Sequence, residues 1–150
     1  MADSVKSVDA APGWTGHPQR VQVRFEPETL GTVEDELVVN AGEFGEYRCR
    51  LVGVCRRPQP QGPLDVGANT SRDLTIRNVF GEDQDYVFTI DNPNFQLGAQ
   101  QLNIKAKSTG TCVVKYQPTG APAASDTAKL FVSCPAVPDM PPWVFYLKGT

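Results

Sequence analysis

Apolar and polar residues alternate along several short segments of the chain, and no segment shows convincing helical periodicity. The alternation is clearest at Val21-Val23-Phe25, Tyr86-Phe88-Ile90, Cys112-Val114-Tyr116 and Trp143-Phe145-Leu147. A period of two is typical of strands that bury one face. Clusters of turn-forming residues, such as Gly42 to Gly45 and Gly81 to Asp85, separate these segments. The pattern predicts an all-β, immunoglobulin-like antiparallel sandwich.

An internal repeat is the most informative feature of the sequence. The segments Val21–Pro27, Leu37–Val39 and Tyr47–Gly53 recur as Cys112–Pro118, Leu130–Val132 and Trp143–Gly149. In both copies an aromatic residue precedes a proline by two positions, and an aromatic residue, a leucine and a glycine occupy matching places in the last segment. Two copies of one strand pattern imply the ends of two domains in tandem.

The position of the repeat sets the expected domain boundaries. Only the second copy follows enough chain to hold opening strands, which we expect at Pro63–Val66, Leu74–Phe80, Tyr86–Ile90, Phe95–Leu97 and Leu102–Ile104. Residues 62–150 are therefore predicted to form a complete sandwich, and residues 20–57 the terminal strands of a preceding one. Residues 58–61 are predicted to be a Pro-rich linker, and residues 1–19 a flexible N-terminal segment.

The predicted half-sandwich at residues 20–57 would leave an apolar face and a strand edge open. This segment is therefore a candidate surface for self-association. Within the complete sandwich, we expect Trp143 and Phe145 to be major contributors to the core, because they begin its last strand.

Several motifs resemble a known family. The ending Val23-x-Phe25-x-Pro27, Leu37-Val38-Val39 and Tyr47-x-Cys49-x-Leu51-x-Gly53 resembles the close of an ASH domain, the module of abnormal spindle, hydin and related ciliary proteins, which is similar to the major sperm protein fold. Asn78-Val79-Phe80 and Asp91-Asn92-Pro93-x-Phe95 resemble the next tandem domain of a ciliary central-apparatus protein. The resemblance covers about residues 20–150. It implies a structural role in the axoneme of a cilium or flagellum, with axonemal or cytoskeletal partners. Because an antiparallel sandwich has strand edges with unpaired backbone groups, we expect these partners to bind through sheet edges.

Charge and hydropathy limit the kinds of partner that the chain is expected to bind. The formal net charge is -3 and the pI is about 5.1, which disfavours nucleic acid as a partner. No apolar run reaches the roughly 18 residues of a membrane span, and the start lacks the pattern of a secretory leader. We expect a cytoplasmic protein without a membrane span. Arg48, Arg50, Arg56 and Arg57 form a candidate interaction patch, with a solvated strand face as the alternative.

Catalytic chemistry has little support in the sequence. His17 is the one histidine, and the cysteines show no CxxC spacing. We predict no catalytic residue, no metal site, no cofactor and no enzyme activity. The sequence from Asp91 to Phe95 resembles a calcium-binding linker, but a turn formed by its asparagine and proline residues is the favoured interpretation.

The cysteines raise an alternative function. Cys49 and Cys112 are separated like the disulfide of an extracellular immunoglobulin domain, yet Tyr47 precedes the first cysteine of that pair, and no tryptophan lies between the two. Mostly buried free thiols are therefore the prediction. An extracellular adhesion domain and a peptide-binding adaptor like the major sperm protein relatives remain alternatives to the axonemal module.

Overall fold

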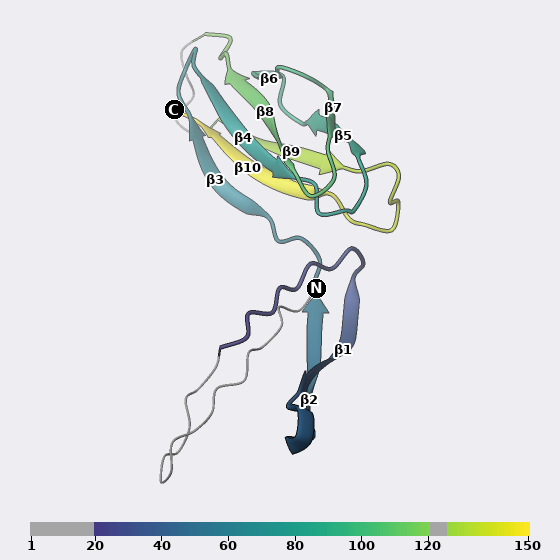
Figure 1. Cartoon of the computed structure of the whole chain (residues 1–150). Coiled ribbons are helices and arrows are strands. Elements are labelled where there is room, and N and C mark those ends of the chain that lie inside the picture. The colour runs from purple at the N-terminus through teal and green to yellow at the C-terminus, as the bar shows by residue number, and fades with distance from the viewer. Residues whose placement is uncertain (1–19, 121–125) are drawn as a thin grey trace. The chain divides into compact units, whose positions relative to one another are not determined.

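The structure is a computed structural model that describes residues 20–120 and 126–150. The predicted flexible segment 1–19, with His17, lies outside the described residues. The chain divides into two compact units. We call residues 20–27 and 31–55 the hairpin unit, and residues 28–30 and 56–150 the sandwich unit. The relative positions of the two units in Figure 1 are not determined.

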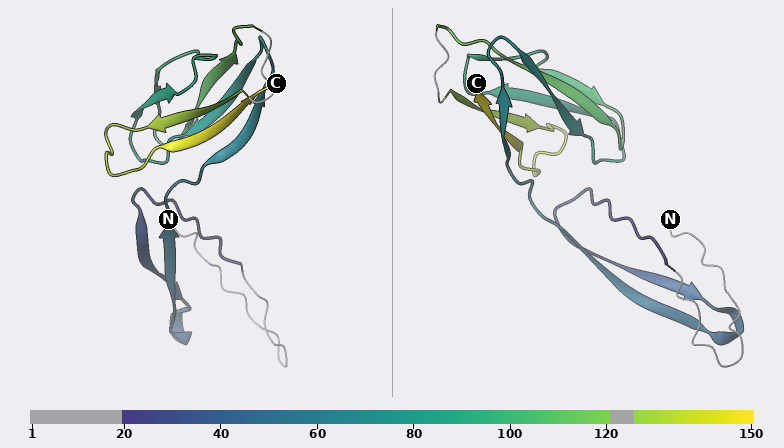
Figure 2. Two further views of the ribbon diagram at one scale, coloured as in Figure 1. Left: turned by 180° about the vertical axis from the view of Figure 1, so that it is seen from behind. Right: turned by 90° about the vertical axis from the view of Figure 1, so that its left-hand side faces the viewer.

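Two facing sheets make up the sandwich unit (Figures 1 and 2). The five-stranded sheet has the order β3 (Gln61–Val66), β10 (Trp143–Gly149), β9 (Thr127–Ser133), β5 (Gln84–Ile90) and β7 (Gln101–Ile104). The three-stranded sheet has the order β4 (Ser71–Arg77), β8 (Thr109–Tyr116) and β6 (Phe95–Leu97). Strands β3 and β10 pair in parallel, and the other pairs are antiparallel. The predicted all-β sandwich is confirmed.

The core lies between the two sheets and uses the alternate residues that the pattern indicated. Along β8, Cys112, Val114 and Tyr116 are buried while the residues between them are exposed. The ring of Tyr116 stacks on Phe95, with 4.7 Å between ring centroids. Burying each large apolar side chain contributes about 1.5–3 kcal/mol. The remaining buried apolar residues of this core are Val66, Leu74, Ile76, Phe80, Tyr86, Phe88, Ile104, Ala128, Leu130, Val132, Cys134, Phe145 and Leu147.

Several details differ from the sequence prediction. The strand expected at Val21-Val23-Phe25 is not formed, since the first strand of the described residues begins at Gly31. The strand expected to reach Phe80 ends at Arg77, and β3 begins at Gln61, the last residue of the predicted linker. Phe145 is buried as expected. Trp143 is only partly buried and packs against the edge of the core, where its ring centroid lies 5.9 Å from that of Tyr86. An aromatic residue at the head of a strand has core on one side only.

The early end of β4 is explained by Asn78, which is completely buried and lies in the loop between β4 and β5. Its Nδ2 donates to the carbonyl oxygens of Glu82 at 2.7 Å and Ile104 at 3.0 Å. Its Oδ1 accepts hydrogen bonds from the Phe80 amide at 3.0 Å and from the Tyr86 hydroxyl at 3.1 Å. One side chain thus pairs several polar groups of a buried loop, which would be costly to leave unpaired.

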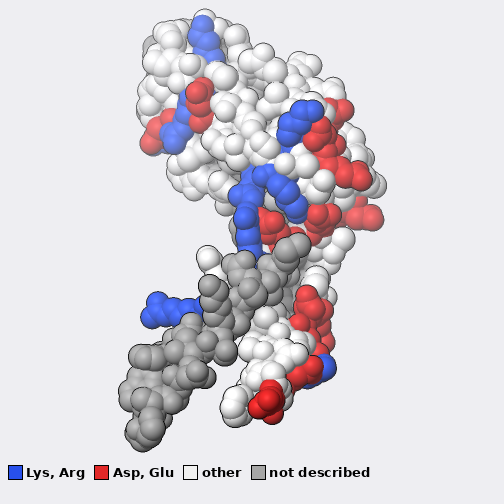
Figure 3. All heavy atoms as spheres, in the orientation of Figure 1, with Lys and Arg blue, Asp and Glu red and all other residues white. Residues whose placement is uncertain are grey.

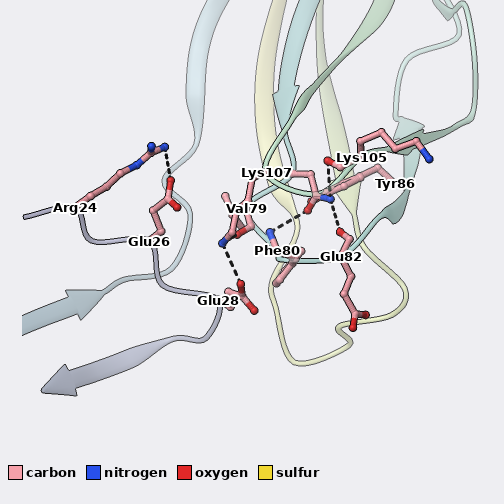
Figure 4. A network of polar contacts seen from close by, with 10 residues as sticks. Arg24, Glu26, Glu28, Val79, Phe80, Glu82, Tyr86, Lys105 and Lys107 are labelled. Carbon is pink, nitrogen blue, oxygen red and sulfur yellow. Dashed lines mark hydrogen bonds and ion pairs between the residues drawn. The ribbon is translucent and has the colours of Figure 1, made fainter. Parts of the chain in front are cut away.

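Lys107 and Tyr86 lie beside this loop. Lys107 has a φ of +54°, and its Nζ donates to the carbonyl oxygen of Val79 at 2.6 Å and to Glu28 Oε1 at 3.0 Å (Figure 4). Burial raises the pKa of Tyr86 to about 12, so its hydroxyl keeps its proton and stays a donor to Asn78 at ordinary pH.

The hairpin unit consists of β1 (Gly31–Asn40), a short 3-10 turn η1 (Gly42–Phe44) and β2 (Glu46–Cys55). The two strands pair along their full length, from Gly31 opposite Cys55 to Asn40 opposite Glu46. Gly42 begins this turn and Gly45 follows it. Their φ values are +62° and +91°, which glycine adopts without strain. Segment 20–27 crosses the hairpin, and a Cβ on Gly53 would collide with the ring of Phe25.

We expect the substitution Asn78→Leu to destabilise the sandwich unit by about 3 kcal/mol, because it leaves buried carbonyl groups and the Tyr86 hydroxyl without partners. Urea unfolding followed by fluorescence measures the change. Asn103→Ala is the control, since the Asn103 side chain is exposed and donates to the Asp85 carboxylate at 2.9 Å. A loss below about 1 kcal/mol for Asn78→Leu would show that this network does not hold the loop.

Candidate interaction surface

The β1–β2 hairpin has one apolar face and one charged face. Directly opposed residues share a face, so the register places Leu37 with Cys49, Val39 with Tyr47, and Val33 with Gly53 on one side. The same register places Glu34 with Val52 and Glu36 with Arg50 on the other side. The apolar face is the side on which Phe25 lies over Gly53.

The pairing of β1 with β2 repeats that of β9 with β10, residue for residue. Leu37 opposite Cys49 and Val39 opposite Tyr47 correspond to Leu130 opposite Phe145 and Val132 opposite Trp143. The contact of Phe25 with Gly53 also has a counterpart. A Cβ on Gly149 would collide with the Tyr116 ring, as one on Gly53 would collide with Phe25. The sequence repeat is therefore also a repeat of backbone register and of one aromatic-glycine contact.

The two copies differ in how their apolar faces are covered. Leu130 and Val132 are 0% exposed, whereas their counterparts Leu37 and Val39 are only partly buried. Val23 is 52% exposed, although its counterpart Val114 is fully buried. An open groove of about 480 Å³ lies on the hairpin unit. Its lining combines segment 20–27 (Val23, Arg24 and Phe25), residues of the uncovered face (Val33, Asp35, Leu51 and Gly53) and two valines of the other face (Val52 and Val54). An exposed apolar groove of this kind is typical of a binding surface.

The two copies also differ at a strand edge. Strand β10 lies between β9 and β3, so both of its edges are paired. In the described part of the chain, β2 pairs with β1 alone. Its second edge presents backbone N–H and C=O groups that another strand could pair.

The arginines of the predicted patch are partnered with carboxylates where the structure shows their contacts. Arg48 forms ion pairs with Glu36 at 2.9 Å and Glu46 at 3.0 Å, and Arg50 pairs with Glu34. These pairs balance the charge of the outer hairpin face, and exposed pairs of this type contribute about 0–1 kcal/mol each. Figure 3 shows acidic and basic side chains intermixed on the viewed face.

Arg56 and Arg57 belong to the other unit. They follow β2 and fall in the sandwich unit, whereas Arg48 and Arg50 lie on β2 itself. The structure therefore does not show the four arginines as one surface. Their role as an interaction patch stays a prediction.

The Asn-Pro motif builds a turn from its own side chains. Asn92 Oδ1 accepts a hydrogen bond from the Asn94 amide at 3.0 Å. The side-chain amides of Asn92 and Asn94 donate to the two carboxylate oxygens of Asp126 at 2.6 and 2.9 Å. The hydrogen bond from Asn94, helped by that from Asn92, lowers the pKa of Asp126. The motif thus ties the β5–β6 turn to the start of β9, which agrees with turn chemistry and not with a calcium linker.

The cysteines occupy different environments. Cys112 and Cys134 are buried in the sandwich core, Cys55 is partly buried, and Cys49 is exposed on the hairpin. Burial raises the pKa of the Cys112 thiol to about 11. The expectation of mostly buried thiols therefore holds for Cys112 and Cys134 but is wrong for Cys49.

Residues 20–120 and 126–150 contain no cluster of three or more histidine, cysteine and acidic residues that could hold a metal ion. None of the helical structure described there is long and apolar enough to cross a membrane. In the hairpin unit, the groove and the open edge of β2 are features that a partner could use.

Comparisons with known proteins show which proteins the chain resembles. No family model matches the chain. It is 34% identical over 151 aligned positions, 96% of its length, to the human hydrocephalus-inducing protein homolog, and 33% identical over the same share to the mouse hydrocephalus-inducing protein. The chain spans only 3% of the length of either relative.

Among solved structures, the ASH/PapD-like domain 7 of human CEP192 aligns with a TM-score of 0.44 and 9% identity, over 91% of this chain and 95% of that one. The CupB2 chaperone of Pseudomonas aeruginosa aligns with a TM-score of 0.47 and 12% identity, over 59% of this chain and 54% of the chaperone.

The chain carries an ASH, or PapD-like, β-sandwich, as its motifs and its two-layered fold indicated. Over 96% of its length it is a homologue of hydrocephalus-inducing protein, or hydin. The motifs of the chain also resemble those of cilia- and flagella-associated protein forty-seven, whereas the two relatives named above are hydin proteins.

We expect thiol titration to follow the burial of the cysteines. In the native chain, Cys49 should react with a disulfide reagent at pH 8 at least about 100-fold faster than Cys112 or Cys134, because buried thiols react only after opening. In denaturant without reductant, all four cysteines should titrate as thiols. Mass spectrometry of the labelled peptides assigns each rate. A Cys49–Cys112 disulfide in protein from its native compartment would contradict the assignment and support the extracellular alternative.

Proposed function

We propose that the chain is a non-enzymatic structural and protein-interaction module of the axoneme of a cilium or flagellum, as part of a central-apparatus scaffold. The proposal rests on its homology to hydin over 96% of its length. Hydin ASH domains are a non-catalytic module family. The location, the tandem arrangement and the axonemal partners are the parts of the proposal that go beyond this homology.

The geometry supports binding through sheets and not through an enclosed site. The apolar groove and the open edge of β2 both suit an extended partner segment, which could pair with the backbone and bury alternate side chains. Axonemal and cytoskeletal proteins are the proposed partners. The acidic pI of about 5.1 disfavours unassisted binding to acidic polymers.

The extracellular alternative has less support. An immunoglobulin disulfide joins cysteines that face each other across one sandwich core. Cys112 is buried in the core of the sandwich unit, whereas Cys49 is an exposed residue of the hairpin unit. This arrangement favours the cytoplasmic axonemal module.

The proposal predicts where the chain is found in a ciliated cell. A tagged chain should fractionate with axonemes and stay there after detergent has removed the ciliary membrane. Asn103→Ala should behave like the unmodified chain, because its side chain is exposed and donates to the Asp85 carboxylate at the surface. Asn78→Leu should be lost from the axoneme as the sandwich unit unfolds. Recovery of the tagged chain from the secretory pathway or the culture medium would contradict the proposal.

A further inference from the structure

We propose that β4 is a self-association edge, at which two copies of the chain pair their β4 strands antiparallel about a two-fold axis through Thr75. Three observations carry the inference: the free edge of β4, the two opposite charges along it, and the short or blocked edges elsewhere in the sandwich unit. The inference does not depend on the location proposed above.

Strand β4 has the longest open edge of the sandwich unit among the described residues. It lies at the end of its sheet and pairs over seven residues with β8 alone. The end strands β6 and β7 have only three and four residues. The end strand β3 contains Pro63, which has no N–H group, and its Asp65 carbonyl oxygen accepts a hydrogen bond from Arg72 at 2.8 Å. Proline and a covering charged side chain are typical of protected edges, whereas β4 contains no proline.

The hydrogen bonds on either side of β4 show which of its residues face the free edge. Before β4, the Tyr116 amide donates to the Thr70 carbonyl oxygen at 3.1 Å, and after it the Asn78 amide donates to the Ser108 carbonyl oxygen at 2.8 Å. Both bonds follow the β4–β8 register and use even-numbered positions on the β4 side. Hydrogen-bonded residues alternate along an antiparallel pair. The backbone groups of the odd-numbered residues therefore point away from β8, and these residues are Ser71, Asp73, Thr75 and Arg77.

The edge is complementary to itself in charge. The side chains of Asp73, Thr75 and Arg77 are exposed, whereas the residues between them are buried. A two-fold axis perpendicular to the sheet pairs a strand with its own copy in antiparallel fashion. With the axis at Thr75, Asp73 of each copy lies opposite Arg77 of the other, and the two threonines lie opposite each other. Opposed charges and threonine pairs both stabilise antiparallel strand pairing.

The charges favour this register over its neighbours. An axis at Asp73 or at Arg77 would place like charges opposite each other, which is destabilising. An axis at Leu74 or Ile76 would leave both charges opposite neutral residues. Only the Thr75 axis pairs each charge with its opposite. A second copy of the chain supplies this pattern by symmetry, and it is therefore the occupant that we infer.

Hydrogen exchange of the 150-residue chain at two concentrations tests the pairing at the backbone. We expect the Asp73 and Thr75 amides to exchange at least about threefold more slowly at about 1 mM than at about 20 µM, because the dimer supplies their acceptors. Equal exchange at the two concentrations would overturn the inference. Protection that rises with concentration at β2 and not at β4 would place self-association on the hairpin unit and would also overturn it.

Reversal of each charge tests the register by sedimentation equilibrium. Asp73→Arg and Arg77→Asp each oppose like charges across the axis, so each variant alone should dimerise at least about tenfold more weakly than the unmodified chain. An equal mixture of the two variants should recover the original affinity within about threefold, because every arginine then opposes an aspartate.

A matched control separates this pairing from an effect of net charge. Lys129 is an exposed residue of β9 in the other sheet, and Lys129→Glu changes the charge of the chain by the same amount as Arg77→Asp. It should leave dimerisation within about twofold of that of the unmodified chain. A loss equal to that of Arg77→Asp, or a mixture of the two reversed variants that associates no more tightly than either alone, would overturn the inference.

Discussion

Contact between the two layers of the sandwich is the interaction on which the rest of the structure depends. The inner faces of β9 and β10 are apolar, and burying them against β8 and β4 supplies the main favourable term for folding. Tyr116 shows how close this contact is, because its ring lies where a side chain on Gly149 would stand. The hairpin unit has the same kind of inner face and the same aromatic-glycine contact, but only segment 20–27 crosses it. The same sequence pattern therefore occurs twice: once with its apolar face covered by a second layer, and once with that face largely uncovered.

Polar groups determine where the strands of the sandwich stop. Asn78 ends β4 by accepting and donating hydrogen bonds inside the loop that follows. The Asp126 carboxylate holds the turn of Asn92 and Asn94 at the opposite end of β5. Both networks use short side chains whose hydrogen bonds are satisfied within the protein, so the loops are fixed by named contacts. A module with fixed loops and edges suits a scaffold, in which the spacing of binding surfaces must be constant.

Local pattern was sufficient to predict much of this fold. The alternation in Cys112-Val114-Tyr116 predicted an inward face. The repeat aligned Leu130 with Leu37 and Phe145 with Cys49, and the registers of the two strand pairs agree with that alignment. The role of Asn78 was not predictable in this way, because its partners Ile104 and Lys105 are distant in sequence. The ion pairs of Arg48 and Arg50 with glutamates depend on how the two strands are aligned. That register cannot be derived from the positions of the arginines in the sequence. The exposure of Cys49 has the same cause: its counterpart Phe145 is buried by strands that the hairpin lacks.

The central claim is that equivalent strands differ in stability because one pair is covered and the other is not. Residue-resolved hydrogen exchange of the 150-residue chain by NMR compares the amides of Leu51 and Leu147, which hold the same place in the two copies. The account predicts that the Leu147 amide exchanges only through global unfolding of the sandwich unit, and that the Leu51 amide exchanges at least about 1,000-fold faster through local opening. Equal protection of the two amides in a monomeric chain would contradict it.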